Sequence, residues 1–218
     1  MVNGELVLHL DGARPLSAAS VEEVDDLCDR AEDERDSGPV TLHVTGVPPA
    51  GWTKELTVGL VSKWERVVRR FERLARVTVA VASGDCAGMA LDLLLAADIR
   101  IIDPGTRLLL ARVGGGVWPG MTVHRLTRQA GAAGIRRAVL LGAPIDAERA
   151  LALNLVDEVS GDPAAALGEL SEAAAALDGA DLAIRRQLIF EAGSTAFEDA
   201  LGAHLAAADR ALRRETAS

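Results

Sequence analysis

The stretch that decides the fold is VTVAVASGDCAGMALDLLLAADIRII, which runs from Val77 to Ile102. Its first six residues, 77–82, are rich in β-branched side chains and predict a buried strand. The chain then breaks at Ser83–Asp85 and continues as a strongly apolar helix over Met89–Ala97. Strand character resumes at Ile99–Ile102, so the segment predicts a strand–turn–helix–strand unit of an α/β fold.

A small-residue turn, Ala87–Gly88, connects this strand to its helix. The first N–H groups of a helix have no partner within the helix, and the helix dipole adds partial positive charge there. Such a turn suits an oxyanion or a phosphate. Ordinary α/β junctions have the same pattern, so a functional and a purely structural interpretation both remain open at this point.

The composition limits the class of protein. A chain of 218 residues can form one sizeable core, and its formal net charge of -9 disfavours nucleic acid or an anionic membrane as a partner. The N-terminus lacks a basic and apolar leader, and no apolar run reaches about 18 residues, so we expect neither secretion nor a membrane span. Cys28 and Cys86 are too few for a disulfide framework, and no spacing suggests a metal site. These features predict a cytoplasmic protein.

The first half of the chain contains an approximate repeat. Three predicted strands read LVLHLDG, VTLHVTG and VTVAVASG, and they end at Gly12, Gly46 and Gly84. Amphipathic helices are predicted between them, one from about Ser20, with a capping-box pattern, and one over Lys54–Leu74. Repeated strand–helix units predict parallel strands joined by crossover helices.

The second half contains a glycine-rich loop and a helical end. Gly114–Gly120 could cradle a phosphate, but Pro119 cannot donate an N–H, so a tight or mobile turn is the favoured interpretation. The clearest break in composition is Gly161–Pro163. We therefore predict a core over residues 1–160 and a helical region over 161–218, with helices near 164–176, 182–191 and 197–213.

Several motifs in order resemble the enoyl-CoA hydratase/isomerase (crotonase) superfamily. SGDCAGMALDLLLAADIRI is similar to its N-G-x-x-x-G-G-G signature, which is followed by a Glu and an A-x-D-I-R-I tail. Gly116–Gly120, GVWPG, resembles the family's G-x-x-P-G turn, and LLGAPIDAERALALNLVDEV at 140–159 resembles its T-G-x-x-I-x-A segment. The likeness spans roughly residues 5–160. It implies a spiral of ββα repeats whose C-terminal helices, 161–218, assemble a homotrimer or hexamer.

The resemblance also implies a chemistry. Members of the superfamily bind an acyl-CoA thioester without a further cofactor and stabilise its enolate through two backbone N–H groups. One N–H falls at Met89, which follows Gly88 and replaces the middle glycine of the signature. The other is assigned to Ala50, in the loop Pro48–Trp52, which lacks the family's usual A-G-A-D.

The two glutamates that hydratases of this family use are both replaced. Asp92 stands at the first position, in the first turn of the helix, where the dipole would keep it ionised as a base. The alternative interpretation of Asp92 is structural: a negative charge that interacts favourably with the helix dipole and takes no part in catalysis. Arg112 stands at the second position and cannot act as a base because it stays protonated. We expect it to pair with Asp92, to bind an anionic substrate oxygen, or to be a surface charge.

The short chain and altered glutamates resemble one branch of the superfamily, the small crotonase-like proteins of 3,5-dihydroxyphenylglycine biosynthesis for glycopeptide antibiotics. This implies a polyketide-derived CoA thioester and assistance with dehydration and aromatisation towards 3,5-dihydroxyphenylacetyl-CoA. A type III polyketide synthase and a second crotonase-like enzyme are the implied partners. The alternative is a non-catalytic subunit that stimulates either partner.

Overall fold

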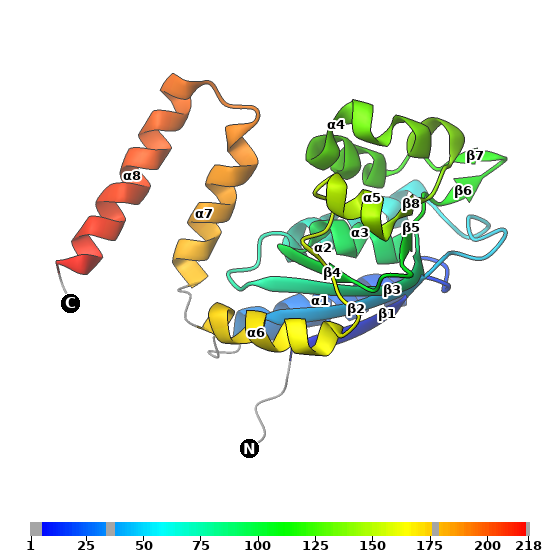
Figure 1. Ribbon diagram of the computed structural model, residues 1–218, viewed down its shortest axis with the longest axis horizontal. Coiled ribbons are helices and arrows are strands. Elements are labelled where there is room, and N and C mark those ends of the chain that lie inside the picture. The colour runs from blue at the N-terminus through cyan, green and yellow to red at the C-terminus, as the bar shows by residue number, and fades with distance from the viewer. Residues whose placement is uncertain (1–5, 34–37, 176–178, 217–218) are drawn as a thin grey trace, which may run out of the picture.

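The computed structural model describes residues 6–33, 38–175 and 179–216 (Figure 1). Its strands are β1 (Val7–Asp11), β2 (Val40–Gly46), β3 (Thr78–Cys86), β4 (Ile99–Ile102), β5 (Arg107–Leu108), β6 (Arg112–Val113), β7 (Gly116–Val117), β8 (Ile145–Asp146) and β9 (Glu158–Val159). Its helices are α1 (Ala18–Asp33), α2 (Val58–Phe71), α3 (Met89–Ala96), α4 (Met121–Leu141), α5 (Ala147–Ala152), α6 (Pro163–Ala175), α7 (Gly179–Ala192) and α8 (Phe197–Glu215).

The main sheet has the strand order β1-β2-β3-β4-β9, and all these neighbours are parallel. The short strand β5 extends the end of β3 in parallel and pairs with β8 antiparallel. Helices α1, α2 and α3 follow the first three strands in turn. This alternation confirms the α/β class and the parallel, helix-connected strands predicted from the repeat.

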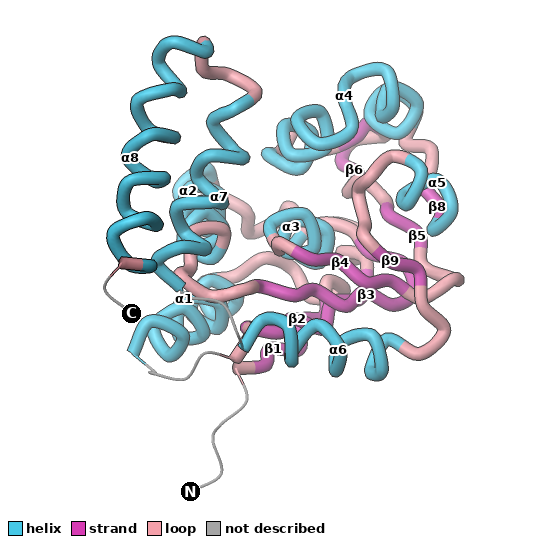
Figure 2. The backbone as a smooth tube through the Cα atoms, turned by 60° about the vertical axis from the view of Figure 1, so that its left-hand side comes forward, coloured by secondary structure: helices cyan, strands magenta, loops and turns pink. Residues whose placement is uncertain are grey.

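Both faces of the sheet are covered, which explains the near-continuous apolar text of β3. Alternate residues of a strand point to opposite faces. Ala80 and Ala82 accordingly join the large core beneath α1, α2 and α3. Val79 and Val81 pack on the other face with Ala166 of α6. Figure 2 shows α6 along one side of the sheet and α3 on the other, between the sheet and α4.

Two helix starts differ from their predictions because other side chains cap them. Ser20 is not the cap of α1: the helix begins at Ala18, and the hydroxyl of Ser17 accepts a hydrogen bond from the backbone N–H of Ser20 at 3.2 Å. The α2 helix begins at Val58 rather than at Lys54. Its cap is Thr57, whose hydroxyl accepts from the N–H of Leu60 at 3.1 Å.

The predicted break at Ser83–Asp85 is also wrong. The strand continues to Cys86, because Gly84 adopts a φ of 65° that adds an irregularity instead of a stop, and β5 supplies a new partner for the extension. The glycine-rich loop forms the turn of the β6–β7 hairpin. Gly114 and Gly115 have φ values of 55° and 81°, as the two central residues of a tight hairpin turn require.

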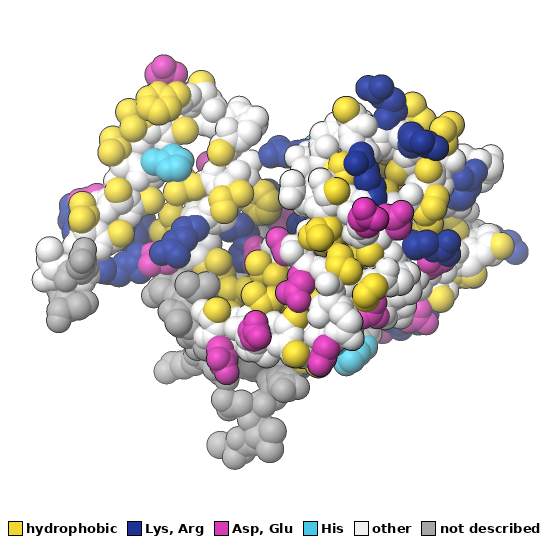
Figure 3. All heavy atoms as spheres, viewed as in Figure 1, with side chains coloured by type: hydrophobic (Ala, Val, Ile, Leu, Met, Phe, Trp, Pro, Cys, Tyr) yellow, Lys and Arg dark blue, Asp and Glu magenta, His cyan; other side chains and the backbone are white. Residues whose placement is uncertain are grey.

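The C-terminal helices leave the core as an antiparallel pair, α7 and α8 (Figures 1 and 2). Arg186 of α7 anchors the pair, because its guanidinium donates to both carboxylate oxygens of Asp98, at 2.7 and 2.5 Å, and to the carbonyls of Leu74 and Arg76. Figure 3 shows apolar side chains along both helices. The exposed large apolar residues there are Ile189, Phe190, Phe197, Leu201, Leu205 and Leu212.

Ala176, the expected end of the first C-terminal helix, lies outside the described residues. Among the helices of the described ranges, none has the length and apolar character needed to cross a membrane.

Candidate functional site

A cavity lies where the turn before α3 meets α2, the loop after β2 and the start of α4. Its volume is about 40 Å³, room for about three water molecules. Two carboxylates, Glu65 and Asp92, belong to its wall. All three tryptophans of the chain, Trp52, Trp64 and Trp118, also line it. The site is therefore an apolar, aromatic pocket with a pair of acidic groups, as small-molecule sites commonly are.

The Gly88–Met89 turn forms one side of the cavity. Gly88 has a φ of 56°, which favours glycine, and a Cβ there would lie 3.3 Å from Pro48. The first intrahelical bond of α3 runs from the N–H of Asp92 to the carbonyl of Gly88 at 2.9 Å. The N–H of Met89 therefore precedes the hydrogen-bonded part of the helix and can serve an oxyanion. The Met89 side chain is accommodated in the core, where it is 5% exposed.

Asp92 is held by three neighbours. Its Oδ2 accepts a hydrogen bond from Nε1 of Trp64 at 3.0 Å, and its Oδ1 accepts from the hydroxyl of Thr122 at 2.5 Å. The guanidinium of Arg125 completes the set, with Nη1 at 3.6 Å from Oδ1. A buried carboxylate needs such partners, because an unpaired buried charge is strongly unfavourable.

Burial changes the acidity of Asp92. Burial raises the pKa of this carboxyl, and Arg125, Thr122 and Trp64 act in the opposite direction. The direction is contrary to the prediction from the helix dipole, which would lower the pKa of Asp92. Burial prevails because the side chain is enclosed by α2, α3 and α4, a surrounding that the local sequence does not reveal.

Arg125 of α4 links Asp92 to two glutamates of the α2 segment. Its Nη2 donates to Glu65 at 2.8 Å, and its Nε donates to Glu72 at 3.1 Å. The third nitrogen, Nη1, faces Asp92 and is the one buried side-chain polar atom without a hydrogen-bond partner in the described part of the chain. One guanidinium is therefore shared among three carboxylates.

Glu65 is the second carboxylate in the cavity wall. Burial raises its pKa, the negative charge of Asp92 adds to this effect, and the hydrogen bond from Arg125 opposes it. The side chain is 21% exposed, compared with 11% for that of Asp92. Glu65 thus lies closer to solvent than Asp92 while sharing the same cation.

The aromatic wall is fixed in place. The rings of Trp52 and Trp118 meet edge to face, with centroids 5.4 Å apart and planes at 76°. Nε1 of Trp52 donates to the carbonyl of Arg112 at 3.0 Å. A Cβ at Gly120 would lie 2.6 Å from Nε1 of Trp118, so glycine is required for Trp118 to take this position.

Comparisons with known proteins identify the fold and the family. A sequence profile of the enoyl-CoA hydratase/isomerase family matches residues 54–217. The chain belongs to the enoyl-CoA hydratase/isomerase family. It is 80% identical over 217 residues to a protein of Amycolatopsis orientalis named enoyl-CoA-hydratase, with 100% of both chains covered.

Solved structures of the family agree with this fold. A family member from Silicibacter pomeroyi superposes with a TM-score of 0.82 at 21% identity, covering 97% of each chain. An enoyl-CoA hydratase from Shewanella pealeana superposes with a TM-score of 0.80 at 17% identity, covering 98% of this chain and 86% of that one. These likenesses confirm the predicted crotonase-like fold.

Of the residues predicted for a crotonase-type site, the cavity brings together Gly88, Met89 and Asp92. Ala50 is exposed and is not among the lining residues, although Pro48 and Trp52 of the same loop are. The assignment of the second N–H donor to Ala50 therefore gains no support from the cavity.

Arg112 does not pair with Asp92. The cation that faces Asp92 is Arg125 of α4. The Arg112 side chain is exposed on the β6–β7 hairpin and donates from Nη2 to the carbonyl of Gly115 at 2.7 Å. Its neighbour Ala111 lines the cavity, but Arg112 does not. Of the three roles expected for Arg112, the geometry favours a hairpin surface charge.

Glu65, Trp64 and Arg125 were not predicted as site residues. Trp64 belongs to the apolar face of α2, and nothing in the sequence indicates a hydrogen-bond partner for its N–H. Glu65 follows it directly and lies seven positions before Glu72, so both carboxylates border the same buried face. That spacing is the one sequence signal that could have pointed to this side of the site.

The cysteines take no part in this arrangement. Cys28 and Cys86 are both buried, and burial raises the pKa of each thiol to about 12. Among the described residues, no group of three or more His, Cys, Asp or Glu is placed to hold a metal.

The buried thiols give a direct prediction. At pH 8 a thiol with this pKa is deprotonated in only about one molecule in 10⁴, and the thiolate is the reactive form. We expect neither cysteine to react with Ellman's reagent in the folded protein, and both to react after unfolding in guanidinium chloride. Rapid reaction of one thiol in the native protein would contradict the burial of that cysteine.

Proposed function

We propose that this protein acts on a CoA thioester with a cyclic, polyketide-derived acyl group. In this role it assists dehydration and aromatisation towards 3,5-dihydroxyphenylacetyl-CoA in dihydroxyphenylglycine biosynthesis. The observation that carries the proposal is a single cavity that combines the free N–H of Met89, the carboxyl of Asp92 and three tryptophans.

In the proposed reaction the thioester carbonyl accepts a hydrogen bond from the backbone N–H of Met89. Asp92 removes a proton from the carbon next to the carbonyl, and the electron pair moves onto the carbonyl oxygen. The developing negative charge is stabilised where the helix dipole is favourable. A carboxyl whose pKa burial raises is a stronger base than an exposed one once it is ionised, which suits this role.

The shape of the wall supports a flat acyl group. Trp52 and Trp118 offer two perpendicular ring surfaces, and Leu110 and Met121 add apolar contacts. Planar, unsaturated rings pack well against such surfaces.

The proposal extends to assembly and location. The proposed reaction needs no cofactor, because the CoA thioester is its substrate. The exposed apolar residues of α7 and α8 support a homotrimer or hexamer, because helices with such faces generally bury them against other subunits. A type III polyketide synthase and a second crotonase-like enzyme are the proposed partners, in the cytoplasm.

A second candidate is a non-catalytic subunit that stimulates one of these partners. The observation that favours it is the position of Arg112, where the family's second glutamate is replaced by a residue that cannot act as a base.

Reconstitution separates the two candidates. The synthase is incubated with malonyl-CoA and either the wild-type protein or Asp92→Ala, and aromatic product is measured. We expect Asp92→Ala to lower the stimulation by about 10²-fold or more. Equal stimulation by both proteins would support the non-catalytic role and contradict the catalytic one.

A further inference from the structure

We infer that Glu65 is the second acid–base group of this site and replaces, from α2, the carboxylate that the chain lacks at Arg112. This inference rests on the proposed function. In this inference Asp92 removes the proton from Cα, and Glu65 donates a proton to the hydroxyl group that leaves.

Glu65 lies in the same cavity as the other groups of the proposed site. Glu65 and Asp92 come from different helices, yet both line the cavity that contains the Met89 turn. Arg125 holds Glu65 through Oε2 only, at 2.8 Å. In the described part of the chain no hydrogen bond engages Oε1, so this oxygen remains available to a bound molecule.

Carboxylates outnumber the cations that contact them in this cluster. Arg125 faces Glu65, Glu72 and Asp92 at once, and Arg69 adds one further cation to Glu72 at 2.7 Å. Among the described residues, two cations therefore form ion pairs with these three carboxyl groups. One proton held on a carboxyl balances the cluster, and a carboxyl that holds a proton can act as a general acid.

The hydrogen-bond donors around each carboxyl indicate which group holds this proton. Asp92 receives hydrogen bonds from Trp64, whose N–H can only donate, and from Thr122, and it also faces Nη1 of Arg125. These three groups stabilise the ionised form of Asp92 against the burial that raises its pKa. Glu65 has one such group, Arg125, on Oε2, and its Oε1 accepts no hydrogen bond in the described part of the chain and can carry a proton. Burial raises the pKa of Glu65, and the charge of Asp92 adds to this effect. Carboxyls in contrasting surroundings commonly divide the roles of base and acid in this way.

The step balances as an elimination of water from a 3-hydroxyacyl thioester. Asp92 takes the Cα proton, and the C–H electron pair forms the enolate and then the carbon–carbon double bond. The bond from Cβ to the hydroxyl breaks, and the departing oxygen takes the proton of Glu65 and leaves as water. Asp92 ends protonated and Glu65 ends ionised. Asp92 then releases one proton to solvent and Glu65 takes one up, which restores both groups.

The experiment measures two reactions of one probe, 3-hydroxy-3-phenylpropionyl-CoA. Incorporation of deuterium at Cα in D₂O reports the step assigned to Asp92. Formation of cinnamoyl-CoA reports the step that also needs Glu65. Glu65→Gln is compared with the wild type, because Gln can still accept the hydrogen bond from Arg125 but cannot supply the proton. Glu55→Gln, at an exposed position before α2, is the control.

We expect Glu65→Gln to lower the kcat of dehydration by about 10²–10⁴-fold and to leave deuterium exchange within about threefold of the wild type. Dehydration by Glu65→Gln at the wild-type rate would overturn the inference and leave the proposed function intact. If the wild type catalyses neither reaction, the proposed function fails and the role of Glu65 fails with it.

A further variant covers loss of folding. If Glu65→Gln melts at a lower temperature than the wild type, Glu65→Asp is tested, which keeps a carboxyl in the cluster. Dehydration by Glu65→Asp at least about tenfold faster than by Glu65→Gln supports the role of the carboxyl. Equal rates of the two variants overturn it.

Discussion

Replacement of Arg125 by methionine is expected to lower the free energy of unfolding by about 3–5 kcal/mol at pH 7.5. Arg125 is the shared cation of Glu65, Glu72 and Asp92, and its side chain is 9% exposed. Methionine keeps much of the apolar stem but leaves the carboxylates without this partner. In this variant Glu72 keeps its ion pair with Arg69, whereas Glu65 loses the hydrogen bond that Arg125 donates.

The deficit is expected to depend on pH. Burial already raises the pKa of Glu65 and Asp92 above their ordinary values, so the folded state binds more protons than the unfolded state above about pH 4. These two groups therefore make the protein less stable as the pH rises through the range above their ordinary pKa values. Without Arg125 their pKa values rise further, and the loss of stability is expected to be larger at pH 7.5 than at pH 5.5.

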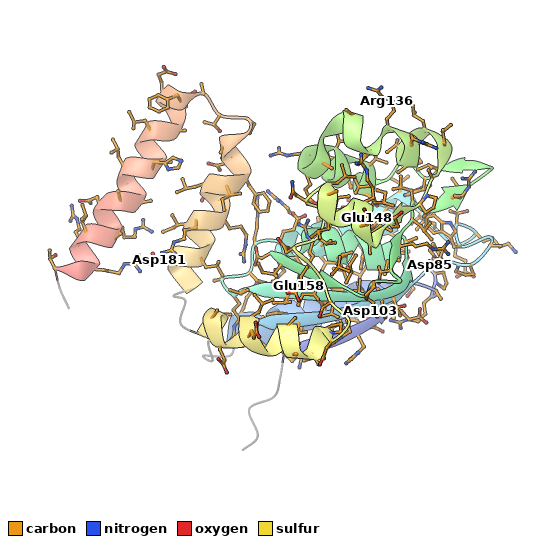
Figure 4. The ribbon with its side chains drawn as sticks, viewed as in Figure 1. Asp85, Asp103, Arg136, Glu148, Glu158 and Asp181 are labelled. Atoms are coloured by element: carbon orange, nitrogen blue, oxygen red, sulfur yellow. The ribbon has the colours of Figure 1, made fainter. Side chains whose placement is uncertain are left out.

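Urea unfolding at the two pH values measures this effect. Arg136→Met provides the matched control, because Arg136 lies on the same helix with its side chain exposed (Figure 4). Its free energy of unfolding is expected to stay within about 0.5 kcal/mol of the wild type. If Arg125→Met behaved like Arg136→Met at both pH values, the shared-cation description of the cluster would be wrong.

The parts of the site that are contiguous in sequence could be predicted. The β-branched run after Val77 and the turn at Gly88 determine a strand that enters a helix, and the free N–H of Met89 follows from that geometry alone. The repeat of strand and glycine likewise predicts parallel strands. Such inferences succeed because they rest on local backbone preferences.

The parts of the site that depend on distant segments could not be predicted. Arg125 reaches Glu65 across 60 positions, and Asp92 reaches Trp64 and Thr122 across 28 and 30. Periodicity shows that Trp64 faces a core, but not which polar group its N–H meets there. The pKa of Asp92 could not be predicted for the same reason. The helix dipole is a property of α3 alone, whereas the burial of Asp92 depends on the packing of three helices.

Asp92→Asn is expected to have the largest effect on activity. In the proposed mechanism Asp92 alone removes the Cα proton, so its loss lowers the rate of enolate formation by about 10²–10⁴-fold. Asparagine preserves the packing of the site: its carbonyl can accept from Trp64, and its amide can donate to the hydroxyl of Thr122. Thermal unfolding of the variant checks that the fold is kept.

The proposed mechanism requires that this cavity form the enolate of a CoA thioester with Asp92 as the base. Deuterium exchange at Cα of 3,5-dihydroxyphenylacetyl-CoA in D₂O, followed by mass spectrometry, measures that step without any partner protein. We expect rapid exchange with the wild type and exchange at least about 10²-fold slower with Asp92→Asn. Equal exchange by both proteins, or exchange by neither above the rate in buffer alone, would contradict it.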